Sequence, residues 1–407
     1  MNTHTFQPLF LTGTVRSGTT LLARLLSVHE QVMVASDPFL PLFRHLRNAL
    51  AGASSDPEVQ ARFRPHHPLY EGYYRPWQLK VLHLLLDGEL EVPFDPALHQ
   101  ECLEACRARM AAECPDLIPF LPQVPAPDFR QSFDRALETV ARARGCAHRR
   151  WVGFKDVWIV DFFPLLARAY PQARFVVIMR DPRAVAASNL AFRTRDPSQV
   201  AHPLSLYRHW RKYLALVLHY QAGSPLASRL HLLRYEDLVR HPEQEVRRLC
   251  RFLEVEFDPR MLDSGNYYDW ARGGTWRGNS SYVSRVAGIS TEFLERWRRV
   301  LSPSELALVE LVCAPEMELL GYQAETGREH LPAAVRQLAE DHGRDWAWRS
   351  DLEDPVADAG AELLRRTLLE GGEDEADPGL VRSCYLFPEV FTRLREHLAR
   401  SEGRAED

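Results

Sequence analysis

Near the start of the chain, two glycines and a group of small polar residues have the spacing of a loop that binds a phosphate. Gly13 and Gly18 are separated by four residues, an apolar run precedes them, and a helical pattern follows. The backbone N–H groups of such a glycine loop (residues 13–20) can point at one anion, and the N-terminus of the next helix adds partial positive charge. The predicted chemistry is anion binding, and the candidate ligands are Arg16, Ser17, Gly18, Thr19 and Thr20.

The glycine loop follows the P-loop template except at one position. The template places a lysine and then a serine or threonine after the second glycine, whereas this chain has Thr19 and Thr20, with its cation at Arg16. Magnesium–nucleotide chemistry would require that lysine at the outer phosphates and an acidic residue at the end of a strand such as 174–179, where none stands. The loop therefore favours an anion site without magnesium over a nucleotide-triphosphate site, and over a tight turn that binds nothing.

A second anion-binding group follows the apolar run 174–179. Arg180 comes directly after this run, at the carboxyl end of a predicted parallel strand, where α/β sheets bind their ligands. Ser188 lies in the helix predicted next and is expected to face the same site. An arginine and a hydroxyl suit a phosphate because charge-assisted hydrogen bonds are strong. Without the first loop, the same residues would equally describe a capped helix start with a surface ion pair.

A parallel sheet is needed to bring these residues together. Short apolar runs alternate with helical patterns, which predicts an α/β fold with right-handed crossovers. The predicted strands are 8–13, 32–35, 151–155, 174–179 and 230–234. We expect one α/β domain over 1–327 with a large helical insertion at about 44–150, followed by a helical C-terminal extension over 328–407.

Composition limits the function classes. The chain has 407 residues, of which 45% are hydrophobic and 26% charged, which is the profile of a globular protein. Its formal net charge of -5 argues against nucleic-acid binding. Seven scattered cysteines show no zinc-site spacing, and no segment has the pattern of a signal peptide or a membrane span. These features predict a cytoplasmic chain without a metal site.

Taken together, two stretches resemble the sulfotransferases that use 3′-phosphoadenosine 5′-phosphosulfate (PAPS). Arg16-Ser-Gly-Thr-Thr-Leu resembles their 5′-phosphosulfate loop, and the stretch from Arg180-Asp-Pro-Arg to Ser188 is similar to their 3′-phosphate motif. The resemblance continues at Leu233-Arg-Tyr-Glu-Asp-Leu and at Trp276-Arg-Gly-Asn-Ser-Ser, and it leaves 51–149 and 328–407 unmatched. It implies a P-loop-type parallel sheet flanked by helices.

The resemblance also implies roles for single residues. Arg16 and Lys155 would stabilise the departing 3′-phosphoadenosine 5′-phosphate, Tyr235 would meet the adenine, and no metal would be required. The implied donor-binding set is Arg16, Ser17, Gly18, Thr19, Thr20, Arg180, Ser188, Tyr235, Arg277 and Gly278.

The base that would deprotonate an acceptor is less directly indicated. Cytosolic phenol sulfotransferases have a histidine two residues after the lysine, and this chain has Val157 there. The protein-tyrosine sulfotransferases are more similar in this respect, since they place a catalytic carboxylate where this chain has Asp37. Asp37 could instead cap a helix that begins at Pro38. The reserve candidates are His66, His67 and Asp156.

We therefore expect the chain to transfer a sulfuryl group from PAPS to a hydroxyl of a small-molecule, carbohydrate or lipid-like acceptor. Asp37, Arg16 and Lys155 are the expected catalytic residues. Two alternatives stay open at this point: a P-loop small-molecule kinase or NTPase, and a nucleotide-binding protein without catalytic activity. The sequence identifies neither the acceptor nor the oligomeric state.

Overall fold

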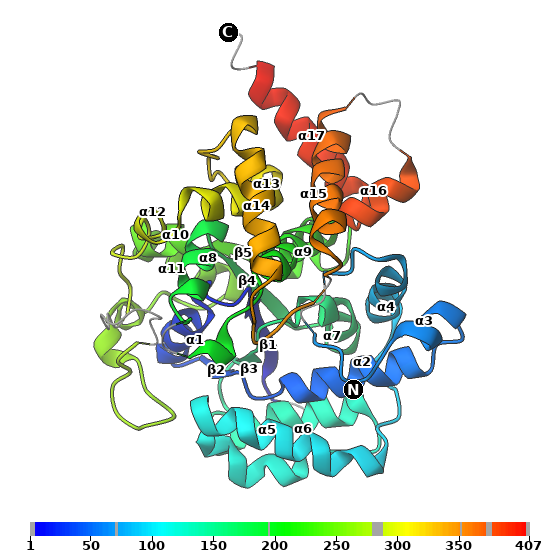
Figure 1. Ribbon diagram of the computed structural model, residues 1–407. Coiled ribbons are helices and arrows are strands. Elements are labelled where there is room, and N and C mark those ends of the chain that lie inside the picture. Colours follow the sequence, from blue (N-terminus) through cyan, green and yellow to red (C-terminus); the bar gives the residue numbers. More distant parts are fainter. Residues whose placement is uncertain are drawn as a thin grey trace. The chain divides into compact units, whose positions relative to one another are not determined.

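The fold centres on a parallel β-sheet of five strands (Figure 1). The computed structural model describes residues 5–69, 72–193, 196–278, 288–350, 352–371 and 377–403. The strands are β1 (Gln7–Gly13), β2 (Val32–Ser36), β3 (Trp151–Lys155), β4 (Arg174–Met179) and β5 (Leu230–Arg234). They lie in the order β2-β3-β1-β4-β5, and each neighbouring pair is parallel. The predicted α/β fold class is confirmed, and each strand falls within two residues of its predicted bounds.

Aromatic side chains on one face of the sheet explain why these short runs form buried strands. Phe10 of β1 is in register with Phe154 of β3 and with Phe175 of β4. Its ring centroid lies 5.3 Å from that of Phe154 and 5.6 Å from that of Phe175. Phe39 and Phe163 add rings to the same cluster. Burial of these rings is the main apolar contribution that fixes the strand register.

The chain divides into two compact units, which we treat separately. The first unit (1–69, 80–180 and 225–291) contains all five strands, and the second unit (70–79, 181–224 and 292–407) is helical. Helices wholly within the first unit are α1 (Thr19–Val28), α2 (Leu40–Gly52), α3 (Pro57–Arg62), α5 (His99–Glu113), α6 (Phe129–Ala143), α7 (Phe163–Ala169), α10 (Tyr235–Arg240) and α11 (Pro242–Leu253). The predicted insertion is helical, and it supplies α5, α6 and the 3₁₀ helix η2 (Pro115–Gln123) between them.

The second unit holds the C-terminal extension, which is helical as predicted. Its helices are α8 (Pro182–Leu190), α9 (Pro203–Gln221), α12 (Trp297–Val300), α13 (Pro303–Leu319), α14 (Leu331–His342), α15 (Pro355–Glu370), α16 (Pro378–Tyr385) and α17 (Pro388–Gly403). Helix α4 (Pro76–Asp87) crosses the boundary between the units. Between residues 291 and 300, the short helix α12 is the one helix that forms.

Buried ion pairs join the extension to the rest of the second unit. Arg208 on α9 donates to Asp358 at 2.9 Å and to Glu362 at 2.8 Å, and both carboxylates belong to α15. These side chains are at most 6% exposed. Breaking such a buried pair on one side leaves an uncompensated charge, so the extension is part of this unit's core. Within the described ranges, no helix combines the length and apolar character needed to cross a bilayer.

Candidate active site at the carboxyl ends of the strands

Each of the five strands ends at, or is directly followed by, a residue that the sequence had singled out. In a parallel sheet the carboxyl ends of all strands meet at one edge, which is where α/β proteins bind ligands. The register keeps these ends level, since Ser36 pairs with Lys155 and Met179 pairs with Arg234. The residues at this edge are the glycine loop after β1, Asp37 after β2, Lys155 at the end of β3, Arg180 after β4 and Tyr235 after β5. The first unit alone therefore assembles most of the predicted site.

The glycine loop has a backbone conformation that Gly18 makes possible. Gly18 has φ +87° and is the N-cap residue of α1, whose first turn carries no acidic residue. A Cβ atom at this position would lie 2.5 Å from Cδ2 of Tyr235 and would clash. Position 18 therefore requires glycine for two reasons: the left-handed backbone and the close approach of the Tyr235 ring. The arrangement leaves the N-terminus of α1 without a side-chain cap, as a phosphate cradle requires.

Arg16 and Arg180 connect the loop to the ends of β4 and β5. Arg16 is a non-glycine residue with φ +67°, and its carbonyl oxygen accepts a hydrogen bond from Nη1 of Arg180 at 3.1 Å. The guanidinium carbon of Arg180 lies 4.5 Å from the centroid of the Tyr235 ring. Burial raises the pKa of Tyr235, and Arg180 opposes this effect, so the phenol stays neutral. The two arginines place positive charge at the edge of the sheet beside the loop.

Asp37 and Lys155 form an ion pair at the same edge. Lys155 Nζ contacts Asp37 Oδ2, and the Asp37 backbone N–H donates to the Lys155 carbonyl oxygen at 2.6 Å. Lys155 is 2% exposed and Asp37 is 19% exposed, so the carboxylate is the partner that an incoming molecule can reach. Asp37 has φ +53°, a conformation that is rare for a residue with a side chain and that clusters at functional sites.

The alternative interpretation of Asp37 as a helix cap is wrong. Helix α2 begins at Leu40 and has Phe39 as its N-cap residue, without any side-chain cap. The Phe39 N–H instead donates to Asp156 Oδ2 at 2.9 Å. The Asp37 carboxylate contacts Lys155 instead.

Arg109 was not identified from the sequence, and Asp156 was identified only as a reserve base. Asp156 Oδ1 lies 3.3 Å from Nη2 of Arg109, which comes from α5 of the insertion. Asp156 is fully buried, and burial raises the pKa of its carboxyl to about 7, with Arg109 opposing the rise and Asp37 adding to it. Both Asp156 oxygens accept hydrogen bonds, from the Phe39 N–H and from Arg109, and its place as a reserve base stays a prediction. No local pattern in the sequence marked Arg109, which lies outside the two motifs that carried the resemblance.

The two reserve histidines are placed away from this edge, in the loop after α3. Arg47 Nη2 donates to the His67 carbonyl oxygen at 2.5 Å, and the His67 ring lies 5.8 Å from that of Phe63. Burial lowers the pKa of His67 to about 4, and Arg47 lowers it further in the same direction. His66 is exposed beside it. The structure does not bring either histidine to Asp37 or Lys155.

The remaining predicted donor ligands are placed as follows. Ser188 lies on α8 in the second unit and is 3% exposed. Arg277 is exposed, and Gly278 has φ +83° at the end of a described segment. Residues 279–281 of the same motif lie outside the described residues. Contact of Ser188, Arg277 and Gly278 with a donor stays a prediction. Within the described ranges, no group of three or more histidine, cysteine, aspartate or glutamate side chains could hold a metal ion.

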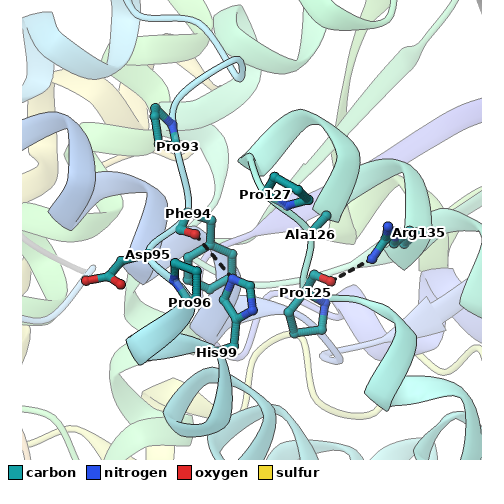
Figure 2. Close-up of a pocket in the computed structure, with 9 residues that line it drawn as sticks. All are labelled: Pro93, Phe94, Asp95, Pro96, His99, Pro125, Ala126, Pro127 and Arg135. Atoms are coloured by element: carbon teal, nitrogen blue, oxygen red, sulfur yellow. Dashed lines mark hydrogen bonds between the residues drawn. The ribbon is translucent and has the colours of Figure 1, made fainter.

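A separate pocket of about 410 Å³ lies in the insertion (Figure 2). Its walls are mainly proline and aromatic side chains around Phe94, and its polar groups are paired within the protein. His99 Nε2 lies 3.2 Å from the Phe94 carbonyl oxygen, and Arg135 donates to the Pro125 carbonyl oxygen at 2.7 Å. None of its lining residues was a predicted site residue.

The parallel sheet has a glycine loop after β1 and cations, Lys155 and Arg180, at the ends of the strands beside β1, which defines a P-loop-type α/β fold. A family model described as "Sulfotransferase family" matches residues 8–259, a stretch that contains the whole edge described above. The chain belongs to the sulfotransferase family. The resemblance stated from the two sequence motifs is thereby confirmed.

Several curated proteins are similar to this chain. Carbohydrate sulfotransferase 3 of Mus musculus is 27% identical over 240 residues, which cover 52% of this chain and 47% of that protein. Carbohydrate sulfotransferase 7 of Mus musculus is 27% identical over 387 residues, covering 81% and 77%. A putative protein-tyrosine sulfotransferase of Caenorhabditis briggsae is 24% identical over 183 residues, covering 43% and 61%. The chain thus spans about half the length of the first of these relatives.

Proposed function

We propose that this chain transfers a sulfuryl group from PAPS to a hydroxyl group of an acceptor. The observation that carries the proposal is the ion pair between Lys155 and Asp37 at the same sheet edge as the glycine loop. A phosphate cradle, a cation and an acidic side chain then lie at the ends of neighbouring strands. Transfer of a group from a phosphate leaving group requires these three features: a site for the phosphate, a cation for the leaving oxygen and a base for the acceptor.

The donor side of the proposal rests on the glycine loop and the arginines beside it. Backbone N–H groups of the loop and the hydroxyls of Thr19 and Thr20 would hold the 5′-phosphate, with Arg16 as the nearby cation. Arg180 would hold the 3′-phosphate, with Ser188 and Arg277 as further ligands, and Tyr235 would lie near the adenine. The fit is supported by the cradle itself, since Gly18 gives the loop its left-handed backbone and α1 begins without a capping side chain.

Residues at the carboxyl edge of the sheet are sufficient to accept the proton and to stabilise the leaving group in the proposed reaction. The acceptor oxygen forms a new bond to sulfur while the bond from sulfur to the bridging phosphate oxygen breaks, and 3′-phosphoadenosine 5′-phosphate leaves. The acceptor proton goes to the Asp37 carboxylate. Lys155 carries three N–H donors, of which the contact with Asp37 uses one, so the others can neutralise charge on the leaving oxygen.

A carbohydrate hydroxyl is the first acceptor to test. This choice is supported by the carbohydrate sulfotransferases, one of which matches 81% of this chain. Small-molecule and lipid-like alcohols and tyrosine peptides are the other acceptors in the screen. Cytoplasmic location and reaction without a metal stay predictions.

A ligand comparison tests the donor assignment. We expect 3′,5′-diphosphoadenosine to raise the melting temperature of the chain far more than 5′-AMP or magnesium ATP does, because only the diphosphate occupies both anion sites. Radiolabelled PAPS is then offered with the acceptor panel, and label should pass to a hydroxyl acceptor. Equal stabilisation by all three nucleotides would contradict the 3′-phosphate site, and magnesium-dependent phosphate transfer from ATP would support the kinase alternative.

A further inference from the structure

We propose that Arg109, supplied by the inserted segment, is a positioning residue that holds the Asp37 carboxylate in its working orientation. The inference rests on the proposed function, in which Asp37 takes the acceptor proton. It assigns a role to a helix of the insertion, which matched no motif in the sequence.

Two atoms of the rigid Arg109 guanidinium make three contacts at the turn that carries Asp37. Its Nε donates to the Asp37 carbonyl oxygen at 3.3 Å, and its Nη2 lies 3.6 Å from Asp37 Oδ1. The same Nη2 donates to Asp156 Oδ1 at 3.3 Å. Because a guanidinium is planar and its donors have fixed directions, these contacts set the backbone and the carboxylate of Asp37 together.

The turn needs such a clamp because Asp37 has a left-handed backbone. A residue with a side chain keeps φ near +53° only where the surrounding structure over-determines it. The Asp37 turn (residues 36–39) is held from both sides. The β3 side supplies the Lys155 carbonyl and the Asp156 carboxylate that binds the Phe39 N–H. The insertion supplies Arg109 and also Cys114, whose Sγ lies 3.3 Å from the Ser36 carbonyl oxygen.

Charge explains why an arginine stands at this point. Two carboxylates, Asp37 and Asp156, lie against one lysine, and Lys155 is also required at the leaving oxygen in the proposed reaction. Asp156 is fully buried, where an ionised carboxylate is stable only beside a cation. Arg109 gives Asp156 that cation, and Asp156 in turn fixes the guanidinium so that it can orient Asp37. Asp37 Oδ1 accepts no hydrogen bond from any described residue, and Nη2 of Arg109 lies 3.6 Å from this oxygen.

Arg109→Ala and Arg107→Ala form a matched pair for the test. Arg107 lies on the same helix two residues earlier and is exposed, so its loss removes an equal charge without touching the turn. The full-length chain is assayed with radiolabelled PAPS and the acceptor that the wild-type chain uses best. We expect Arg109→Ala to lower kcat by about 100-fold, the cost of a small misplacement of a reacting group. The acceptor KM and the stabilisation by 3′,5′-diphosphoadenosine should stay within twofold of the Arg107→Ala values.

Two further readouts separate positioning from a merely structural ion pair. Added guanidinium ion should restore part of the kcat of Arg109→Ala and should leave Arg107→Ala unchanged. Arg109→Lys, which keeps the charge but not the fork, should retain an intermediate kcat. If Arg109→Ala does not fold, Arg109→Lys decides the matter, because a wild-type kcat in that variant would overturn the proposal.

Hydrogen exchange of the segment 36–43 tests the clamp without relying on activity. Faster exchange in Arg109→Ala than in Arg107→Ala is expected, since the turn loses its contact to the insertion. Equal exchange in the two variants, or a kcat of Arg109→Ala within twofold of Arg107→Ala, would overturn the inference. Failure of the proposed function looks different: the wild-type chain itself would transfer no label, while the exchange measurement would still report on the clamp.

Discussion

The proposed donor side and the proposed acceptor side of the sheet edge are constructed in opposite ways. The donor side is dominated by eight consecutive residues, 13–20, whose backbone shape makes the cradle. The acceptor side is assembled from three distant segments, and its working parts are side-chain charges: Asp37 after β2, Arg109 on α5, and Lys155 with Asp156 at the end of β3. We therefore expect the glycine loop to be sensitive to changes in its backbone conformation. The charged residues at the ends of β2 and β3 should be sensitive to the loss of a single charge.

The largest effect is expected on the acceptor side, from Lys155→Ala. The substitution removes both the partner of Asp37 and the cation proposed at the leaving oxygen, so kcat should fall by about 10²–10³-fold, as when one stabiliser of developing charge is removed. Turnover of labelled PAPS measures kcat, and melting temperatures with 3′,5′-diphosphoadenosine report donor binding. Donor binding should change much less than kcat. If both fall together, Lys155 belongs to the donor side and the division drawn above is wrong.

The next largest effect is expected from Gly18→Ala, which changes the backbone shape of the glycine loop on the donor side. Gly18→Ala forces a side chain onto a backbone with φ +87° and against the Tyr235 ring, so we expect a loss of about 1–2 kcal/mol in the free energy of unfolding. The affinity for 3′,5′-diphosphoadenosine, measured by calorimetry, should fall about tenfold or more, equivalent to about 1.4 kcal/mol.

Gly52→Ala is the control for this glycine. Gly52 ends α2, its φ is not positive, and a Cβ there would meet nothing within 4 Å. Its free energy of unfolding should change by less than about 1 kcal/mol, with alanine favoured. Equal effects of the two substitutions would show that the shape of the glycine loop does not matter for the donor.

The smallest effect concerns the pH dependence of stability. Burial raises the folded pKa of Asp156 to about 7, against an unfolded value near 3.8, while Arg109 and Lys155 oppose the rise and Asp37 adds to it. The protonated carboxyl therefore favours the folded state below about pH 4, and this contribution is lost as the pH rises through about 7. Urea unfolding of wild type and Asp156→Asn should show the wild-type advantage shrinking between pH 4 and 7, then staying level. A constant difference across that range would mean that Asp156 is not titrating in the folded protein.

Short-range signals in the sequence were sufficient for much of the fold and for the donor side. Apolar runs of four to six residues bounded by glycine, proline or charge placed all five strands, because a strand buried on both faces is largely apolar. The Asp37 cap alternative failed because the helix begins two residues beyond Pro38.

The sequence by itself determined the parallel sheet, the glycine loop and Arg180, since each depends on residues close together in the chain. It also placed Asp37 and Lys155 at strand ends without showing that they touch. The tertiary structure alone decided that Arg109 reaches the Asp37 turn from α5, 72 residues further along the chain. A contact of that kind leaves no periodicity or spacing in the sequence, because it depends on how the insertion folds back onto the ends of β2 and β3.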